Sequence, residues 1–482
     1  MRRHAANPII TAADVPPSHP QLRVVGVFNA GAVRCHLTGD VILLLRVAEQ
    51  AVTDVADGGT NVVLRIPMMV PRVATTTEGA DRNDVDNHNP QRSLELRIVT
   101  LRRDDVGLDF SDSRVVFDVT SSPKRIVALT SLSHIRLARS QDGVRFTIGS
   151  APFIFPEDEH ESWGCEDARI LWMPEDAPTG CGNRFANLDD FGRNKSDEPS
   201  GGERHAPIAS AARASGSERH HDGGYYVMSY TAVSPFGAAT ALCTSKDLVS
   251  VNRLGIAFPV ENKDVCIFPR KIDGRFVAYH RPVPKSIGNP DIWMAESDDL
   301  IHWGKHRRIL GGSNPCSSIE RALLLDQQKD THVHTGALSS AATLQPIGRV
   351  ATSSWDNGRI GGGAPSIETA RGWVHFFHAA DERHRYCLGA LLTPLNDPSR
   401  IIARSAVPIL TPDADCERFG FFGNVVFTCG VVWGSRNRSS SGKVADDDLD
   451  AELLVYYGAA DDKMCLASIS LRDLFSSLDV VV

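Results

Sequence analysis

The 482-residue sequence lacks the features of several common protein classes. It has no basic surplus, because its formal net charge is −8 and its isoelectric point is about 6.1. This charge argues against nucleic acids and anionic membranes as partners. The sequence contains no run near the roughly 18 to 20 apolar residues that a membrane-spanning helix needs. The N-terminal MRRHAANPII has two arginines without an apolar core behind them, so we predict no secretory signal.

Paired cysteines are also missing. Ten cysteines are scattered along the chain and none of them lies in a CxxC pair, so neither a zinc ribbon nor a disulfide framework is indicated. We therefore expect reduced, mostly buried thiols in a cytoplasmic protein with no metal and no cofactor. The oligomeric state stays open, and a homo-oligomer is compatible with the composition.

Helical periodicity is nearly absent as well. Short runs rich in Val, Ile, Tyr, Phe and Leu alternate with turn residues, for example at 41–47, 225–232, 275–280, 373–378 and 453–457. This pattern is typical of many short antiparallel strands. The sequence therefore predicts an all-β protein.

A weak repeat runs through these strands. An apolar strand that closes on a small residue and an acidic turn recurs as LARSQDG at 137–143, LCTSKDL at 242–248 and MAESDDL at 294–300, with looser echoes at 388–397 and 466–474. Five echoes indicate four-stranded sheets repeated around an axis, an arrangement that protects sheet edges. Ordinary hairpins of a β-sandwich are the alternative.

Polar segments interrupt the strand pattern at about 74–93, 174–224, 311–357 and 434–450. Long loops of this kind are uncommon in a compact domain. The second and fourth have too few apolar residues to bury, so we interpret them as solvated insertions and not as domains. A lid or a partner-binding arm is the alternative. The chain is thus predicted to be one catalytic domain over residues 1–482.

The segment WGCEDARI at 163–170 is the densest group of candidate catalytic residues. An acidic pair, Glu166 and Asp167, is followed by Arg169 at the start of a strand, which offers an acid with a charge partner nearby. Because neighbouring residues of a regular strand point to opposite faces, we expect the two carboxylates not to form a pair. One would face a pocket and the other would be structural.

Three cations lie beside predicted turns or strand ends. They are Lys263 in ENKDVC, Arg281 in YHRP and Arg359 in RIGGGAP. Taken singly, each is most simply an exposed charge. Together on one axis, they would suit a doubly charged oxyanion.

These motifs resemble glycoside hydrolase family 130, which contains mannoside phosphorylases and hydrolases. Similar segments run from end to end, among them GVFNAGA at 26–32, GCEDARI at 164–170, the block 261–282, RIGGGAPSIETARGW at 359–373 and YYGAADDKMCLA at 456–467. Only the four insertions fall outside the resemblance. It implies a five-bladed β-propeller, and some protozoan members of the family are associated with mannan phosphorylase and mannosyltransferase activity.

The resemblance also implies roles for particular residues. Asp167 matches the proton donor, which acts through a hydroxyl of the bound mannose. The other matches are Asn29, Arg46 and Asp461 in the mannose subsite, Tyr386 and His378 at the border of the pocket, and Lys263, Arg281 and Arg359 at the phosphate. The sequence departs from the family pattern at Ala30 and Ala168, where most members have proline, and this loosens the backbone without removing a catalytic group.

Simple chemistry favours phosphorolysis over hydrolysis. Inverting cleavage by water needs an acid and a second carboxylate that activates the water, whereas phosphate is already a nucleophile and must only be held. We therefore predict an inverting β-mannoside phosphorylase that interconverts a β-mannoside or mannan oligosaccharide plus phosphate with mannose 1-phosphate, with β-1,2 linkages preferred. The alternatives are a β-mannosyltransferase that uses GDP-mannose, a hydrolytic β-mannosidase and, from another class, a non-catalytic sugar-binding propeller.

Overall fold

Strands dominate the computed structural model, which describes residues 1–52, 63–72, 94–175, 223–312, 355–434 and 448–481. Most of them form five antiparallel groups in chain order. Group 1 contains β2 (Leu22–Arg34), β3 (Val41–Ala51), β9 (Leu132–Ser140) and β10 (Thr147–Ile148). Group 2 contains β11 (Gly164–Pro174), β12 (Gly224–Ser234), β13 (Gly237–Ser245) and β14 (Asn252–Phe258). Group 3 contains β15 (Asn262–Ile267), β16 (Phe276–Pro282), β17 (Ile292–Ser297) and β18 (Trp303–Leu310).

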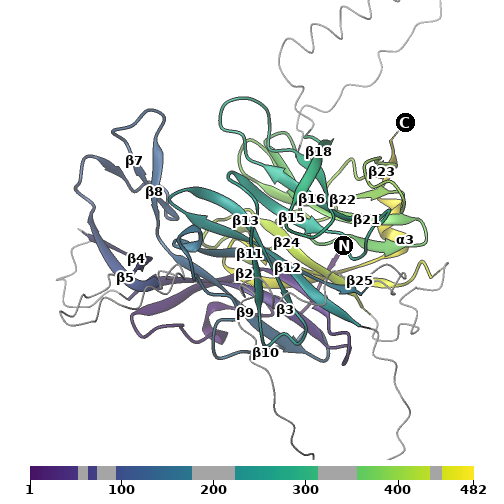
Figure 1. Ribbon diagram of the computed structural model, residues 1–482, viewed down its shortest axis with the longest axis horizontal. Coiled ribbons are helices and arrows are strands. Elements are labelled where there is room, and N and C mark those ends of the chain that lie inside the picture. The colour runs from purple at the N-terminus through teal and green to yellow at the C-terminus, as the bar shows by residue number, and fades with distance from the viewer. Residues whose placement is uncertain (53–62, 73–93, 176–222, 313–354, 435–447, 482) are drawn as a thin grey trace, which may run out of the picture.

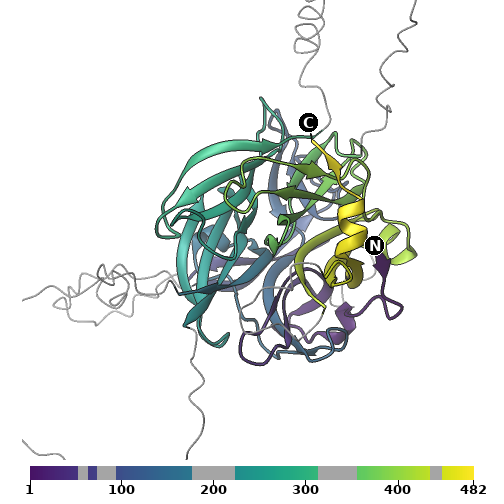
Figure 2. The ribbon, with the colours of Figure 1, turned by 90° about the vertical axis from the view of Figure 1, so that its right-hand side faces the viewer.

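The last two groups recruit strands from distant parts of the chain. Group 4 contains β19 (Arg359–Gly362), β20 (Ile367–Thr369), β21 (Gly372–Ala380), β22 (Tyr386–Thr393), β23 (Ala403–Arg404) and the C-terminal β27 (Asp479–Val480). Group 5 contains β24 (Val426–Trp433), β25 (Glu452–Ala459), β26 (Lys463–Ser470) and the N-terminal β1 (Arg2–Arg3). The N-terminal β1 therefore ties group 5 to the chain that enters group 1, whereas the C-terminal β27 returns to group 4. Figure 2 shows the N-terminus close to the C-terminal helix α3 (Leu471–Ser476).

Apolar clusters link the groups in cyclic order. One cluster joins groups 1 and 2 through residues such as Leu44 and Met228, and the next joins groups 2 and 3 through Leu171 and Val265. Three more join groups 3 and 4, groups 4 and 5, and groups 5 and 1. The core is thus divided between neighbouring strand groups, and the colours in Figure 2 follow the chain around the body from purple through teal and green to yellow.

The sequence repeat has a structural origin. All five echoes fall at β9, β13, β17, β22 or β26, which is the third strand of its group when the strands are counted in hydrogen-bonded order from β2, β11, β15, β19 or β24. In the three closest echoes the strand ends on a serine that bonds the turn. Backbone N–H groups donate to Ser140, Ser245 and Ser297 Oγ at 2.8, 2.8 and 3.0 Å, and an Asp two residues later accepts from the same turn. The expectation of an all-β protein built from a repeated sheet unit is confirmed at this level.

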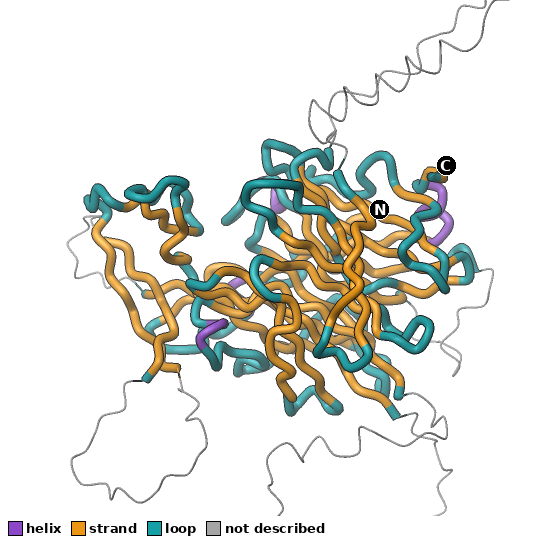
Figure 3. Tube along the Cα trace, turned by 45° about the horizontal axis from the view of Figure 1, so that its top comes forward, coloured by secondary structure: helices purple, strands orange, loops and turns teal. Residues whose placement is uncertain are grey.

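An excursion leaves group 1 between β3 and β9. Its strands are β4 (Val63–Pro71), β5 (Leu94–Arg102), β6 (Leu108–Asp109), β7 (Val115–Asp118) and β8 (Arg125–Leu129). They project from the main body in Figures 1 and 3 and enclose a small apolar cluster around Ile66, Val116 and Ala128. The excursion is larger than the insertion expected at 74–93, because it includes the folded strands on both sides of that segment.

Helices are short throughout the described residues. They are η1 (Ala12–Asp14), η2 (Glu159–Glu161), α2 (Asp415–Arg418) and α3. None of the helices in the described ranges has the length and apolarity required to cross a membrane. The predicted insertions at 74–93, 174–224, 311–357 and 434–450 lie almost entirely outside the described residues.

Candidate active site

The first strands of groups 1, 2 and 3 carry the same backbone irregularity. β2, β11 and β15 each contain a β-bulge, at Asn29, Asp167 and Asp264. These residues have φ angles of 51°, 48° and 58°, in the left-handed region that Asn and Asp tolerate better than other side chains. A bulge re-aims a side chain out of the regular alternation of a strand. The result is a polar contact between groups 1 and 2, in which Asn29 Nδ2 donates to Asp167 Oδ1 at 3.0 Å.

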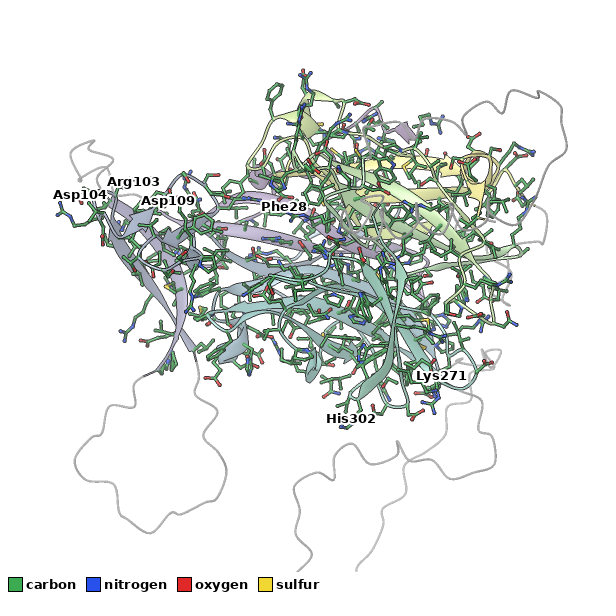
Figure 4. All side chains as sticks on the ribbon, turned by 90° about the horizontal axis from the view of Figure 1, so that it is seen from above. Phe28, Arg103, Asp104, Asp109, Lys271 and His302 are labelled. Carbon is green, nitrogen blue, oxygen red and sulfur yellow. The ribbon has the colours of Figure 1, made fainter. Side chains whose placement is uncertain are left out.

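Arg46 on β3 holds two adjacent carboxylates. Its Nη1 donates to Asp167 Oδ1 at 2.9 Å, and its Nη2 donates to Glu166 Oε1 at 2.7 Å. The guanidinium lies over the ring of Phe28, 4.7 Å from the centroid, and Figure 4 labels this ring. The expectation that Glu166 and Asp167 point to opposite faces was wrong. The bulge at Asp167 breaks the strand alternation, so one arginine reaches both carboxylates.

The pKa values of Asp167 and Asp461 are shifted in opposite directions. Burial raises the pKa of Asp167, but the positive charges of Arg46, Arg169 and Lys263 outweigh burial and hold the pKa below its ordinary value. Asp461 lies between β25 and β26, where burial raises its pKa to about 6 in spite of Arg46. In the free protein at neutral pH, Asp167 is therefore ionised, and Asp461 is the carboxylate that takes up a proton first as the pH falls.

Asp264 is the hub of a buried cation cluster. Its Oδ1 lies 3.1 Å from Arg169 Nη2, and its Oδ2 lies 3.1 Å from both Arg281 Nε and His378 Nε2. Only 2% of the Asp264 residue is exposed. Burial raises its pKa, but Arg281 and His378 reverse this and bring the pKa far below the ordinary range. Asp264 is thus a permanent anion that fixes the cations around it.

Lys263 and Arg281 lie side by side, because they are directly paired between β15 and β16. Lys263 Nζ is 3.7 Å from Glu166 Oε2, and this contact links the cation pair to the carboxylates Glu166 and Asp167. Arg281 is buried, and its Nη1 makes no hydrogen bond to any residue that the structure describes. A buried donor without a partner requires an explanation, and an anion bound beside Arg281 would supply one.

Arg359 reaches this cluster through aromatic side chains. Its Nη1 donates to the hydroxyl of Tyr386 at 3.2 Å. The Tyr386 ring lies 6.1 Å from the ring of His378, which in turn contacts Asp264. His378 is fully buried. The roles predicted for these residues in binding stay predictions.

Two glycines make room for these contacts. A Cβ at Gly361 would overlap Asp264 Oδ2 and lie 2.6 Å from His378 Nε2. A Cβ at Gly458 would overlap the side-chain oxygen of Asn29 and lie 2.9 Å from its backbone nitrogen. Both polar clusters therefore depend on residues without a side chain at these positions.

The sequence analysis expected Arg169 to be a charge partner of the acidic pair, and it left Asp264 without a role, although both residues lie at the centre of the cluster. A usable pattern is present in FNAG, EDAR and KDVC, where an Asn or Asp precedes a small or branched residue at the same point of three inner strands. Within the described residues, no group of three or more His, Cys, Asp or Glu side chains is arranged to hold a metal ion.

Comparison with known proteins defines the class. The model of glycoside hydrolase family 130, described as β-1,4-mannooligosaccharide phosphorylase, matches residues 220–320 and 318–480. An all-β fold with this match is that of a carbohydrate-active enzyme.

Similar relatives cover nearly the whole chain. The β-1,2-mannobiose phosphorylase of Listeria innocua is 32% identical over 99% of this chain and 98% of its own length. A crystal structure of that enzyme in complex with β-1,2-mannobiose matches with a TM-score of 0.68 over 99% of this chain. The 1,2-β-oligomannan phosphorylase of a Thermoanaerobacter species is 34% identical over 71% of this chain and 80% of its own. The chain belongs to glycoside hydrolase family 130 and is an enzyme of the glycosyltransferase/phosphorylase type.

Proposed function

We propose that this protein is an inverting β-mannoside phosphorylase. It transfers mannose reversibly between a β-1,2-linked mannoside and inorganic phosphate, and the product is mannose 1-phosphate. The observation that carries the proposal is the pair formed by Lys263 and Arg281, because these cations adjoin the acid site and Arg281 keeps a buried donor without a partner. A dianionic phosphate is the natural ligand of such a pair. Arg359 completes the anion site from group 4.

The reaction then needs one acid and one nucleophile. A phosphate oxygen attacks C1 of the mannosyl group while the bond from C1 to the glycosidic oxygen breaks. Asp167 gives its proton to a hydroxyl of the mannose, and that hydroxyl passes a proton to the leaving oxygen. A single displacement inverts C1, so a β-mannoside gives α-mannose 1-phosphate.

Phosphate binding prepares the acid for this step. In the free protein, positive charges that include Lys263 hold the pKa of Asp167 below its ordinary value. Two negative charges placed beside Lys263 and Arg281 would offset this field and raise the pKa of Asp167. The acid thus becomes protonated when the nucleophile is in place, which couples proton supply to phosphate binding.

The carboxylates near the cations are poorly suited to activate water. Asp264 is buried and is held by Arg169, Arg281 and His378, so it is neither accessible nor basic. Glu166 has both oxygens occupied, one by Arg46 at 2.7 Å and one near Lys263 at 3.7 Å. The positive charge of Arg46 lowers the pKa of both Asp461 and Asp167, so Asp461 lies near the proposed acid. This arrangement supports phosphorolysis over hydrolysis.

The mannose subsite is proposed to consist of Asn29, Arg46 and Asp461. Arg46 and Asn29 are fixed by their hydrogen bonds to Asp167, so they can present donors next to the acid. Tyr386 borders the pocket beside Arg359. The β-1,2 linkage is supported by the names of the two relatives, a β-1,2-mannobiose phosphorylase and a 1,2-β-oligomannan phosphorylase.

We also propose that the five strand groups are the blades of a five-bladed β-propeller. The cyclic order of the apolar clusters and the entry of β1 into group 5 support this closure. In that architecture the bulges of β2, β11 and β15 would all face the central axis. The acid and the phosphate site would then share one axial pocket.

Product analysis tests the function. The protein is incubated with β-1,2-mannobiose, with and without inorganic phosphate, and in a parallel reaction with GDP-mannose and mannose. We expect mannose 1-phosphate only when phosphate is present. Equal release of free mannose without phosphate would identify a hydrolase, and oligosaccharide synthesis from GDP-mannose alone would identify a nucleotide-sugar transferase.

A further inference from the structure

Arg114 belongs to the excursion between β3 and β9, in the turn that precedes β7, and it is held rigidly. Its Nε and Nη2 donate to the two oxygens of Asp112 at 3.0 and 2.8 Å. Its backbone oxygen accepts a hydrogen bond from the Thr130 N–H at 2.9 Å, and the Thr130 hydroxyl bonds the oxygen of Ser113 at 2.7 Å. The guanidinium is therefore presented in one orientation.

This guanidinium reaches across to group 5 and lies over the ring of Phe422, 3.7 Å from the centroid. The Phe422 N–H donates to the oxygen of Ala460 at 2.9 Å, and Ala460 directly precedes Asp461. Phe422 and Tyr386 also pack on the same small apolar cluster. The excursion thus contacts the main body where the proposed mannose subsite meets the border of the pocket.

The charge of Arg114 affects the pKa of Asp461 in the candidate site. Burial lowers the pKa of Arg114, but its bond to Asp112 and the negative charge of Asp461 raise it overall. Arg114 in turn opposes the rise in the pKa of Asp461. Nη1 is the remaining nitrogen of the guanidinium, and it makes no hydrogen bond within the described part of the chain.

The side chain of Arg114 is more exposed than those of Asp167 and Arg46. The side chains of Asp167 and Arg46 are 12% and 15% exposed, whereas that of Arg114 is 36% exposed. In the proposed reaction the leaving sugar lies outside the mannose subsite. Arg114 is a partly exposed donor whose charge acts on Asp461 of that subsite, so it is placed to contact this sugar.

We propose that Arg114 is a specificity-determining residue for the acceptor sugar, the one that leaves in phosphorolysis and attacks in synthesis. Its Nη1 donates to a hydroxyl of this sugar, and Asp112 and Phe422 keep it in position. Selection of the acceptor therefore depends on the excursion, not only on the five strand groups. The inference rests on the proposed function for its kinetic test, and a binding test is included because it needs no turnover.

The kinetic experiment compares wild type, Arg114→Ala and Arg103→Ala in the synthetic direction, from mannose 1-phosphate and mannose. Arg103 is the matched control, because it is an arginine of the same excursion that lies over a different ring, Phe110, at 5.7 Å, and Figure 4 shows it on the part of the excursion away from Phe28. We expect Arg114→Ala to raise the KM for mannose about 5- to 15-fold. This is at or below the lower end of the range for a charged hydrogen bond, about 10- to 150-fold, because the side chain is partly exposed and solvent weakens the bond. The KM for mannose 1-phosphate should change less than about twofold, and Arg103→Ala should resemble wild type.

The binding experiment measures β-1,2-mannobiose by titration calorimetry without phosphate. A similar weakening in Arg114→Ala supports the proposal even if wild type fails to make mannose 1-phosphate, in which case the proposed function fails alone. The proposal is overturned if neither the acceptor KM nor the binding constant changes. It is also overturned if the KM values for mannose and mannose 1-phosphate rise together, because Arg114 would then act at the inner subsite.

Discussion

Replacement of Arg281 by glutamine removes one cation from the proposed phosphate site and fills much of the same space. Arg281 is buried, and its Nη1 has no partner among the described residues, so water screens its charge little. A charged hydrogen bond of this kind contributes about 1.5 to 3 kcal/mol. Since about 1.4 kcal/mol corresponds to a factor of ten, the KM for phosphate should rise about 10- to 150-fold.

The assay is the initial rate of mannose 1-phosphate formation from β-1,2-mannobiose as a function of phosphate concentration. Arg275→Gln is the matched control. Arg275 adjoins the same strand, β16, but its side chain is 39% exposed and pairs with Glu296 and Asp298 at the surface. The KM for mannobiose should change much less, because Asn29 of the proposed mannose subsite is bonded to Asp167 and not to Arg281. If Arg281→Gln leaves the phosphate KM unchanged in a folded protein, the cations do not hold phosphate.

Four further outcomes are expected. Asp167→Asn should lower kcat about 10²- to 10⁴-fold, the range for general acid catalysis, and near-normal turnover would mean that another group is the acid. Gly361→Ala should cost about 1 to 3 kcal/mol of stability because a Cβ there overlaps Asp264, and an unchanged melting temperature would contradict the described packing. The pKa of Asp264 is lower in the folded protein than the value of 3.8 expected in the unfolded chain, so ionised Asp264 stabilises the fold above about pH 4 and this stability is lost as the pH falls. Below about pH 4 the melting temperature of wild type should therefore fall more steeply than that of Asp264→Asn, and parallel curves would refute this. The pKa of Asp461 is raised from 3.8 to about 6, so wild type loses stability as the pH rises through that range. Asp461→Asn should therefore gain melting temperature at pH 8 relative to pH 4; an equal change at both pH values would show that Asp461 is not perturbed.

The sequence carried enough information for the fold class and for the repeat. Turn chemistry explains why, since the Ser and Asp of motifs such as LARSQDG bond the same backbone turn in successive groups. The extent of the excursion was underestimated. Its strands β4 to β8 have short apolar patterns, and they pack on one another around Ile66 and Val116 in a way that no local motif indicates.

The candidate site was predicted in part. The structure brings Asn29, Arg46 and Asp167 into direct contact, as expected for residues of one site. The relation of Glu166 to Asp167 was wrong because strand alternation assumes a regular strand, and the bulge is a property of tertiary packing. Asp264 was missed for the same reason.

Arg114 could not be predicted at all from its surroundings in the sequence. Its neighbours within the chain, SDSRVV, resemble an ordinary surface turn. Only the contact with Phe422, more than three hundred residues away, places it beside the pocket. Residues that reach a site from an inserted element have no fixed spacing to the residues of that site.

In the proposed reaction, phosphate displaces the leaving sugar in one step at this site. The most direct test is ³¹P and ¹H nuclear magnetic resonance of the first products formed from β-1,2-mannobiose and phosphate. A single displacement by phosphate gives α-mannose 1-phosphate and free mannose in equal amounts from the first turnovers. Formation of β-mannose 1-phosphate, or of two free mannose molecules for each mannobiose consumed, would contradict it.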